Sequence, residues 1–235
     1  MPYGADAMYT LHIANKNYSS WSLRPWVLMR ELNIAFEERL TPFDSTTANA
    51  RFRSFSPTGK VPCLIDGNTT VWDSLAIAEY LAERHPGVWP GDGRARTWAR
   101  CAAAEMHSGF TALRGNCPMT CGMRVRLNQP SAALKADLDR LESLWSQGLT
   151  LFSGPFLAGA AFSAVDAFFA PVAFRIQTYE LKLKAPLLAY ARRLLELPSM
   201  REWYASALAE TTRDSEHDNE LAQLGQIIAD LRAST

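Results

Sequence analysis

The sequence predicts two domains, a small α/β domain followed by a domain made of helices. Three observations predict this class. Strand-like and helix-like segments alternate through the first third of the 235-residue chain. A stretch rich in proline and glycine follows at 87–93, and only helical periodicity occurs after it. We therefore divide the chain into an α/β domain at 8–86, a linker at 87–93 and an all-helical domain at 94–235.

The first domain shows the order β-α-β-α-β-β-α. Its strands are expected at 8–13, 36–40, 61–65 and 69–72, and its helices at 23–32, 49–55 and 74–85. Pro25 falls in the first turn of the first expected helix, where a missing N–H is tolerated. Asp66-Gly67 is a hairpin signal between the last two strands. Asp73 or Ser74 supplies the side-chain cap that begins the last helix.

The second domain shows helical periodicity throughout. Its helices are expected at 98–113, 131–145, 163–181, 185–196, 199–209 and 216–231. The third of these opens with Ser163 and carries Asp166 three residues later, which is the spacing of a capping box. We expect this pair to stabilise the start of the helix, and we therefore do not take Asp166 for a catalytic acid.

The composition limits the classes of function. Hydrophobic residues make up 48% of the chain, which is enough for a packed core and excludes wholesale disorder. Lys and Arg number 24, as do Asp and Glu, so the formal net charge is zero. This balance excludes binding to nucleic acid or to anionic membranes by bulk charge. No apolar run approaches the roughly 18 residues of a membrane span.

The cysteines and the first residues indicate a reduced, cytoplasmic protein. Residues 1–7 show neither the basic nor the apolar segment of a secretion signal, and we assign them no function. Cys117 and Cys121 lack the redox C-x-x-C spacing, and no histidine lies near them in the sequence. We therefore expect free thiols and no metal site.

Two serines mark the start of the first helix. Ser19 and Ser20 follow the first strand and a polar turn. The first N–H groups of a helix are unpaired and carry about half a positive charge, so this end stabilises an anion. A thiolate is such an anion, and the pKa of a thiol falls at a helix N-terminus. The alternative interpretation is that the two serines form a simple cap and turn.

Two further motifs lie near the later strands. Val61-Pro62 precedes the third strand, and a cis bond there would turn the Val61 backbone toward an extended ligand. The sequence leaves the isomer open. Asp73-Ser74 begins the next helix, where Ser74 suits a carboxylate and Asp73 suits an ammonium group. The alternative for this pair is a plain helix cap.

These motifs, in their order and spacing, resemble those of the glutathione transferases. The resemblance covers 8–209 and implies a thioredoxin-like N-terminal domain with a mixed sheet, followed by the all-helical C-terminal domain of that superfamily. Residues 18–24 are similar to the zeta-class (maleylacetoacetate isomerase-like) motif of paired serines, cysteine, serine, an apolar residue and arginine. Trp21 stands where the zeta class has its cysteine, and Pro25 also differs. These departures speak against zeta-type isomerase chemistry and leave activation of a thiol by serine intact.

The resemblance also implies roles for individual residues. Ser19 matches the serine that hydrogen-bonds the glutathione sulfur, and Ser20 matches its neighbour at the helix start. The residues expected to bind the rest of glutathione are Lys60, Val61, Pro62, Asp73 and Ser74. The residues expected to line the co-substrate pocket are Trp21, Arg114, Arg124 and Arg175. Arginines near the thiol suit an anionic acceptor, and the alternative for each is a solvated or structural ion pair.

The leading hypothesis is a serine-type glutathione transferase that presents the thiolate of its co-substrate glutathione to a small electrophile. Three alternatives remain open: a maleylacetoacetate-type isomerase, a glutathione-dependent disulfide reductase or peroxidase, and a non-catalytic binding protein that keeps the transferase fold. The resemblance further implies detoxification chemistry in the cytoplasm, and a homodimer for which Trp72 and Tyr80 offer surface.

Overall fold

The computed structural model describes residues 9–43 and 48–232, and its first domain contains a four-stranded mixed sheet. The order across the sheet is β2-β1-β3-β4, and β1 is parallel to β2 but antiparallel to β3. The strands are β1 (Tyr9–Ile13), β2 (Phe36–Leu40), β3 (Cys63–Asp66) and β4 (Thr69–Trp72). The helices are α1 (Ser20–Glu31), α2 (Ala48–Arg53) and α3 (Ser74–Ala82). The predicted order of elements is confirmed, while Met8 of the first predicted strand lies outside the described residues.

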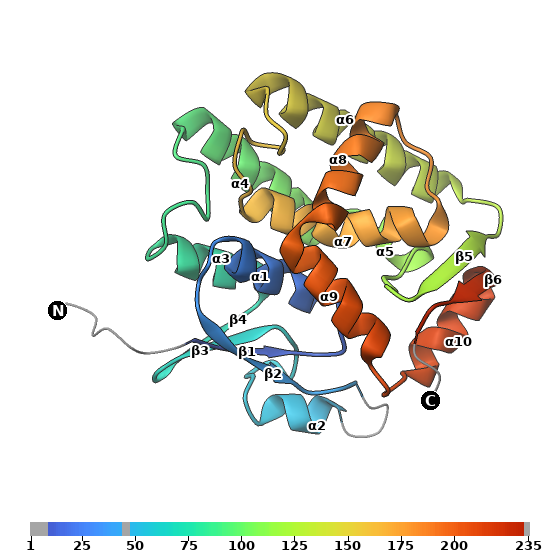
Figure 1. The fold of residues 1–235 in the computed structure, drawn as a ribbon, viewed down its shortest axis with the longest axis horizontal. Helices are drawn as coiled ribbons and strands as arrows, with labels where there is room; N and C mark the ends of the chain where they lie inside the picture. Colours follow the sequence, from blue (N-terminus) through green and yellow to red (C-terminus); the bar gives the residue numbers. More distant parts are fainter. Residues whose placement is uncertain (1–8, 44–47, 233–235) are drawn as a thin grey trace.

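Alternating side chains on the central strand explain how the sheet is covered. Leu11 and Ile13 of β1 are fully buried, and Leu11 pairs with Leu64 of β3. α1 and α3 cover one face of the sheet, and α2 lies on the other (Figure 1). Trp26 and Val27 of α1 are fully buried in the layer between. Residues 14–19 connect the end of this central strand to the N-terminus of α1.

α1 begins three residues before the start that the sequence predicted. The expected helix began at Leu23, whereas the observed helix begins at Ser20 with Ser19 as its N-cap. Pro25 therefore lies beyond the first turn, where it lacks the N–H that would bond to the Trp21 carbonyl. The expectation was wrong because Pro25 was taken to mark the first turn. The longer helix places both serines at its start.

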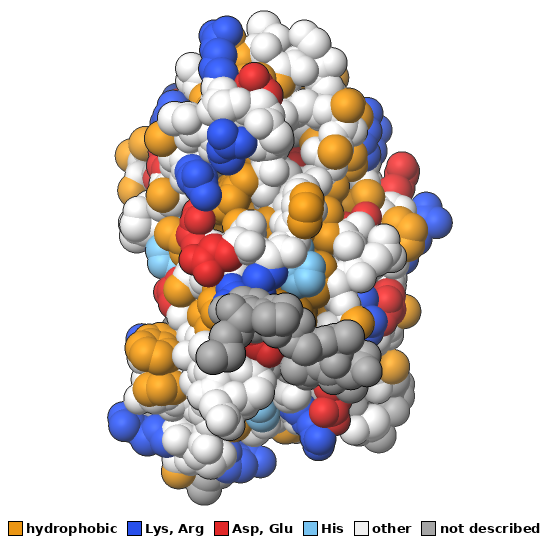
Figure 2. All heavy atoms as spheres, turned by 90° about the vertical axis from the view of Figure 1, so that its left-hand side faces the viewer, with side chains coloured by type: hydrophobic (Ala, Val, Ile, Leu, Met, Phe, Trp, Pro, Cys, Tyr) orange, Lys and Arg blue, Asp and Glu red, His pale blue; other side chains and the backbone are white. Residues whose placement is uncertain are grey.

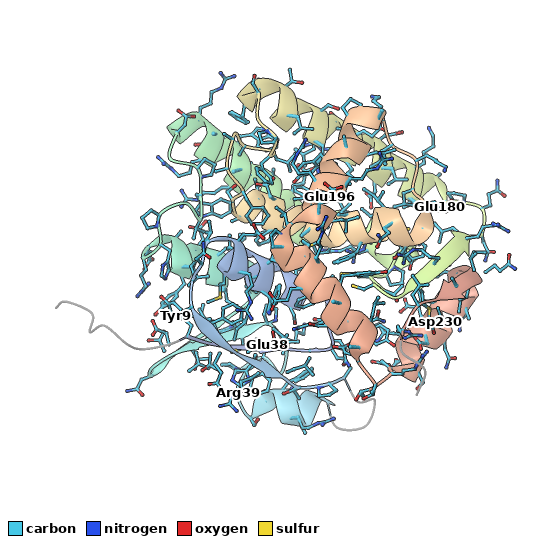
Figure 3. All side chains as sticks on the ribbon, in the orientation of Figure 1. Tyr9, Glu38, Arg39, Glu180, Glu196 and Asp230 are labelled. Atoms are coloured by element: carbon cyan, nitrogen blue, oxygen red, sulfur yellow. The ribbon has the colours of Figure 1, made fainter. Side chains whose placement is uncertain are left out.

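The second domain is built around α7, in which every residue from 164 to 176 is buried. The helices of this domain are α4 (Gly93–Ser108), α5 (Thr111–Asn116), α6 (Ala132–Phe152), α7 (Ala164–Tyr179), α8 (Ala185–Glu196), α9 (Pro198–Ala209) and α10 (Ser215–Leu224). α7 contacts α1 of the first domain as well as α4, α8 and a short strand of its own domain. Side chains fill the space around it (Figure 3). α7 therefore joins the two domains into one packed unit.

A two-stranded antiparallel sheet accompanies these helices. It pairs β5 (Met123–Leu127) with β6 (Gly225–Asp230). The predicted helix at 216–231 is therefore wrong beyond Leu224. A Cβ at Gly225 would lie 2.3 Å from the Arg126 carbonyl oxygen, so only glycine allows the two chains to approach here. The β-branched pair Ile227-Ile228 then favours a strand over a helix.

The predicted capping box at the start of α7 is present, and its carboxylate is fully buried. Asp166 accepts hydrogen bonds from the N–H groups of Ser163 and Leu157, both at 3.0 Å, and from the Tyr190 hydroxyl at 2.9 Å. Burial raises the pKa of Asp166 to about 6. These bonds join three segments of the second domain, which is a structural role.

The surface carries charges of both signs. On the face shown in Figure 2, acidic and basic side chains are interspersed with apolar ones. Among the described residues, no helix combines the length and the apolar character needed to cross a membrane. The same part of the chain contains no group of three His, Cys, Asp or Glu side chains placed to hold a metal ion.

Candidate functional site

A short network of serine hydroxyls builds the N-terminus of α1. The Oγ of Ser19, the N-cap, accepts a hydrogen bond from the Ser22 N–H at 3.4 Å. The Ser19 hydroxyl donates to the Ser22 Oγ at 2.7 Å, and that oxygen also accepts from the Ala14 N–H at 3.2 Å. Both serines are buried. The Ser19 oxygen is thus held between the end of β1 and the first turn of α1.

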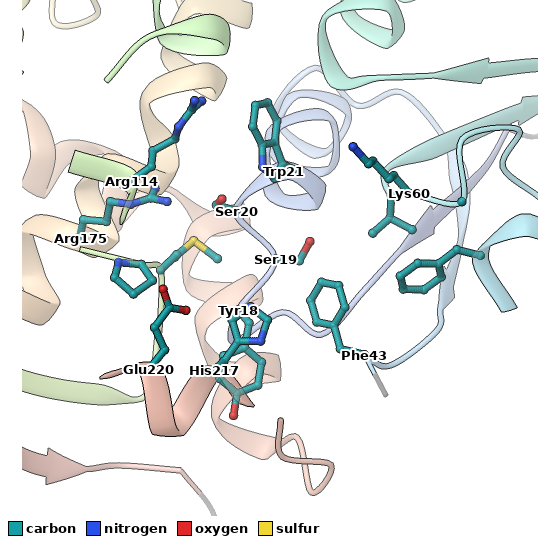
Figure 4. A pocket seen from close by; sticks show the side chains of 15 residues that line it. Tyr18, Ser19, Ser20, Trp21, Phe43, Lys60, Arg114, Arg175, His217 and Glu220 are labelled. Atoms are coloured by element: carbon teal, nitrogen blue, oxygen red, sulfur yellow. The ribbon is translucent and has the colours of Figure 1, made fainter. Parts of the chain in front are cut away.

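Ser20, the first residue of α1, faces a different direction. It is 8% exposed, and its hydroxyl forms no hydrogen bond with another described residue. In Figure 4 the Ser19 hydroxyl is turned to the side of Lys60, and the Ser20 hydroxyl to the side of Arg114 and Arg175. The two hydroxyls therefore point toward different groups of side chains.

A cavity of about 590 Å³ opens in front of this helix end, between the two domains. Residues from both domains form its wall (Figure 4). The residues singled out in the sequence that line it are Ser19, Ser20, Trp21, Lys60, Val61, Arg114 and Arg175. The structure thus brings together residues that lie far apart along the chain.

A second cavity of about 460 Å³ adjoins the first. Trp21, Lys60 and Val61 line both, so the two cavities are neighbours, and we refer to them together as the recess. Pro62, Asp73 and Ser74, also singled out in the sequence, line the second cavity. The Val61-Pro62 bond, whose isomer the sequence left open, is cis.

Arg124 is the exception, because the structure does not bring it to this recess. Its guanidinium donates to the carbonyls of Cys121 at 3.2 Å and Met123 at 2.8 Å, and to the Tyr204 hydroxyl at 3.2 Å. It lines a different cavity. Along β5, Met123 and Val125 are buried, and Arg124 points to the opposite face. The expected co-substrate role of Arg124 is therefore corrected to a structural one.

The start of α3 combines an uncommon backbone conformation with an unpaired hydroxyl. Asp73 has a φ of 72° and a ψ of 135°, a region that non-glycine residues rarely adopt and that clusters at functional sites. Its carboxylate accepts from the Leu75 N–H at 2.8 Å and lies 3.3 Å from His107 Nε2. Ser74 is 2% exposed, and its Oγ has no hydrogen-bond partner in the described part of the chain. Buried hydroxyls are normally satisfied, so this one suits a ligand.

Several residues in the recess were missed in the sequence. His107 lines neither cavity, but it packs edge-on against Trp21 with ring centroids 5.3 Å apart. Burial lowers the pKa of His107, and the nearby Asp73 opposes that shift. His217 stacks on Tyr18 at 5.1 Å. The other missed residues of the wall are Phe43, Phe52, Gly59, Pro118 and Glu220. Tyr18 could have been found because it directly precedes Ser19 in the sequence. No local sequence pattern, however, indicates that α10 packs against Tyr18.

Tyr18 is hydrogen-bonded to residues near the C-terminal end of the described chain. Its hydroxyl donates to Asp218 at 3.0 Å and accepts from Arg232 Nη1 at 2.6 Å. Burial raises the pKa of Tyr18 to about 12, so the hydroxyl stays protonated. α10, which contributes His217 and Glu220 to the wall, is thereby held against the residue that precedes Ser19.

Comparison with known proteins agrees with this arrangement. Residues 18–84 match the family described as glutathione S-transferase, N-terminal domain, and residues 131–206 match glutathione S-transferase, C-terminal domain. Glutathione S-transferase theta-1 of Rattus norvegicus is 30% identical over 168 residues, which cover 61% of this chain and 68% of the relative. The chain belongs to the glutathione transferase superfamily.

Other relatives within the superfamily carry different names. A dichloromethane dehalogenase of Methylophilus leisingeri is 31% identical over 155 residues, which are 59% of this chain and 55% of the relative. The chain spans about half or less of three curated relatives it matches, from 24% to 55% of their lengths. A glutathione transferase homolog from Burkholderia GL BGR1, solved with bound glutathione, has the same fold. The TM-score is 0.64 at 24% identity, over 85% of this chain and 97% of that chain.

The two glutathione transferase family matches cover one side of the recess more completely than the other. The N-terminal match contains Ser19 and Ser74, together with the other residues expected to bind glutathione. The C-terminal match contains Arg175 but neither Arg114 nor α10. Membership of the superfamily therefore explains the side of the recess near Ser19 more fully than the side opposite.

Proposed function

We propose that this protein is a glutathione transferase that holds the glutathione thiol as a thiolate at the N-terminus of α1 and directs it at a small electrophile. The observation that carries the proposal is the Ser19 hydroxyl, held at the N-cap of α1 in the wall of a cavity of about 590 Å³.

A thiolate beside Ser19 gains from both the hydroxyl and the helix. A hydrogen bond from a hydroxyl to an anion is charge-assisted, and the helix N-terminus adds about half a positive charge. The Ser22 hydroxyl can rotate to donate to Ser19, because its oxygen keeps the Ala14 N–H as a donor. Ser19 is then free to donate to the sulfur. Both effects lower the thiol pKa from the value of about 8.5 of a free cysteine.

The second cavity suits the γ-glutamyl end of glutathione. Its α-carboxylate would satisfy the unpaired hydroxyl of Ser74 at the start of α3, and its α-ammonium group would pair with Asp73. The cysteinyl unit would then lie along Val61, which lines both cavities. Lys60 lines both cavities as well and is exposed, and it supplies a cation for the glycyl carboxylate.

Once the thiolate is formed, the remaining chemical step is its attack on the electrophile. The thiolate sulfur forms a C–S bond to the electrophilic carbon. In a substitution, the leaving group departs with its bonding electron pair; in an addition, the displaced π pair takes up a proton. The electrophile would occupy the part of the first cavity bordered by Trp21, Arg114 and Arg175.

The pKa of bound glutathione tests the proposal. The ultraviolet absorbance of the thiolate is titrated against pH for the wild type and for Ser19→Ala. A hydrogen bond to a charged group contributes about 1.5–3 kcal/mol. Because one pKa unit corresponds to about 1.4 kcal/mol, we expect the thiol pKa to rise by about 1–2 units in Ser19→Ala. Glutathione affinity should fall only modestly, since the contacts at α3 remain.

Ser108→Ala is the matched control, because Ser108 is exposed at the end of α4 and donates to the Ala104 carbonyl. Its thiolate titration should equal that of the wild type. A thiolate signal that survives both Ser19→Ala and Ser20→Ala unchanged would refute the serine mechanism. Absence of glutathione binding in calorimetry would point instead to a non-catalytic protein with the transferase fold.

A homodimer is part of the proposal. β4 is an edge strand, and its Trp72 is 44% exposed, an unusual exposure for a large apolar ring. Contact with a second copy would cover this ring. Sedimentation should then give the mass of two chains, and a single-chain mass over the working concentration range would contradict the dimer.

A further inference from the structure

Three arginines from three helices lie near one another, and two of them line the first cavity. Arg24 belongs to α1, Arg114 to α5 and Arg175 to α7. Arg24 is 1% exposed and Arg175 is 3% exposed. Arg114 and Arg175 line the cavity, and Figure 4 shows both on the side to which Ser20 points. Arginine is almost never buried this deeply unless it is paired, so the partners of these side chains matter.

Trp21 connects Arg24 and Arg114. The Arg24 guanidinium carbon lies 4.0 Å from the centre of the Trp21 ring, and that of Arg114 lies 5.2 Å from it. Arg24 also lies 4.9 Å from the centre of the Phe168 ring. A guanidinium stacked on a ring keeps its N–H groups in its own plane, where they remain available to an acceptor.

Several of these N–H groups have no acceptor. Nε and Nη1 of Arg24 and Nη1 of Arg175 are buried without a hydrogen-bond partner among the described residues. Arg175 Nε donates to the Cys117 carbonyl at 2.8 Å, and Arg114 Nη1 donates to the His107 carbonyl at 3.0 Å. These acceptors are neutral. Within residues 9–43 and 48–232, no carboxylate forms an ion pair with any of the three arginines.

The same chain pairs another buried arginine fully. The Arg232 side chain is 2% exposed, and its nitrogens lie 3.0 Å from an oxygen of Asp218 and 2.7 Å from one of Asp230. Carboxylates thus compensate a buried guanidinium elsewhere in this fold. The cavity arginines lack such a carboxylate, and their free donors are therefore suited to an acceptor that comes from outside the chain.

Burial and mutual repulsion oppose the positive charge of these arginines, and Arg175 keeps its charge at neutral pH. Burial is the main cause that lowers the pKa of Arg24, and repulsion from Arg175 and Arg114 adds to it. Burial also lowers the pKa of Arg175 to about 10, which still leaves a cation at neutral pH. The thiol beside Arg175 is neutral, because burial raises the pKa of Cys117 to about 12.

The nearby carboxylates of the described chain form no ion pair with the three arginines. Glu220 is on the cavity wall but is exposed to solvent. Asp73 acts on Arg24 as the weakest of the causes that shift its pKa, and its own contacts are with Leu75 and His107. An anion placed between the arginines would therefore meet more positive than negative charge.

We infer that this wall binds an oxyanion, in the first instance a carboxylate, carried by the electrophilic co-substrate. Arg114 and Arg175 donate to its oxygens together with the Ser20 hydroxyl, and Arg24, which stacks on the Trp21 ring, adds positive charge nearby. The inference rests on the proposed transferase function and names its substrate class, a small electrophile whose reactive carbon lies a few bonds from an anionic group. Fixing the anion also orients that carbon toward the sulfur.

Conjugates of glutathione test the two statements separately. S-(carboxymethyl)glutathione and S-(3-carboxypropyl)glutathione carry a carboxylate where the electrophile would lie, and the corresponding amides have nearly the same shape without the charge. Binding of each is measured by calorimetry. We expect the acid of at least one chain length to bind about 10-fold more tightly than its amide, as charge-assisted bonds to arginine require.

Variants assign the preference to residues. Arg175→Met and Arg114→Met should each reduce the ratio of acid to amide affinity, and Arg175→Lys should keep part of it because a point charge replaces the planar fork. Arg126→Met is the matched control, since Arg126 is exposed on β5 outside the recess, and it should keep the full ratio. S-methylglutathione, bound equally by all variants, reports an intact fold and tripeptide site.

The outcomes are distinct. If the wild type binds S-methylglutathione but binds acid and amide equally at both lengths, the inference is overturned and the proposed function stands. If no conjugate binds, the proposed function fails and the inference fails with it. An acid preference that persists in both Arg175→Met and Arg114→Met would place the anion elsewhere and overturn the assignment.

Discussion

Arg232 offers a direct test of how the C-terminal segment closes the recess. Its guanidinium bonds to Asp218 of α10, to Asp230 at the end of β6 (Figure 3), and to the hydroxyl of Tyr18. Tyr18 precedes the proposed thiol-activating Ser19, and α10 contributes His217 to the cavity wall. We therefore expect Arg232→Met to loosen α10 and β6 from the first domain while the four-stranded sheet stays intact.

The size of the effect follows from the burial of the three partners. Removing one partner of a buried ion pair costs about 3–5 kcal/mol. The side chains of Asp218 and Asp230 are 22% and 31% exposed, so water can replace part of the lost bonding. We therefore take the lower end, about 3 kcal/mol, which corresponds to about a 100-fold increase in the opening equilibrium of this segment.

Hydrogen exchange measures this opening. The amides of α10 and β6 should exchange about 100-fold faster in Arg232→Met than in the wild type, and those of β1 and β3 should be unchanged. Arg192→Met, which removes an exposed arginine of α8, should leave both sets unchanged. Equal exchange of α10 and β6 in Arg232→Met and the wild type would refute the reasoning.

The same network predicts a pH dependence. Hydrogen bonds from Arg232 hold the pKa of Asp230 well below its usual range. A carboxyl whose pKa is lower in the folded state contributes stability above the unfolded value of about 3.9 and loses it as the pH falls below that value. Exchange of β6 in the wild type should therefore accelerate below about pH 4, and Arg232→Met should show a weaker dependence.

Two further predictions concern Asp166 and Ser74. Asp166→Asn should lower the free energy of unfolding by about 2–4 kcal/mol in urea denaturation. The reason is that the amide N–H₂ of Asn would face the Ser163 N–H, which now donates a hydrogen bond to the carboxylate. A loss below about 1 kcal/mol would contradict the structural role. The raised pKa of about 6 further predicts that stability gains from this group as the pH falls from about 6 toward about 4. Ser74→Ala should leave unfolding nearly unchanged, because its hydroxyl has no partner among the described residues, and should weaken glutathione binding about 10-fold in calorimetry. A variant that loses stability but keeps its affinity would show that Ser74 is an ordinary cap.

The first domain could be predicted because its signals are local. A turn such as Asp66-Gly67 and a cap such as Asp73 act within a few residues, and the element order follows from them. The start of α1 was misplaced for the same reason, since Pro25 is a strong local marker and Ser19 a weaker one. β6 was missed because its partner β5 lies about 100 residues earlier, and Gly225 is informative only once that partner is present.

The candidate site shows the same division. Ser19 and Ser74 were singled out because each stands at a helix start, a position that the sequence marks, and the structure places both on the walls of the recess. Arg124 was selected as a cation that would suit an anionic acceptor near the thiol, and only the alternation along β5 turns it away from the recess. Arg24 was noted only as the last residue of the motif at 18–24, because its sequence neighbours give no sign that its guanidinium lies near those of Arg114 and Arg175.

The two sides of the recess thus differ in how their chemistry is encoded. The proposed thiol side uses helix N-termini, which depend on the backbone of the thioredoxin-like domain and are held in place by short-range contacts such as those of Ser22. The opposite side uses side chains from α1, α5 and α7, so a change in α5 or α7 alters it while the proposed glutathione contacts at α1 and α3 remain. A superfamily match therefore carries information about the thiol but little about the electrophile. The unpaired donors of Arg24 and Arg175 carry that second kind of information, because a buried N–H without an acceptor specifies the chemistry of the group that is able to satisfy it.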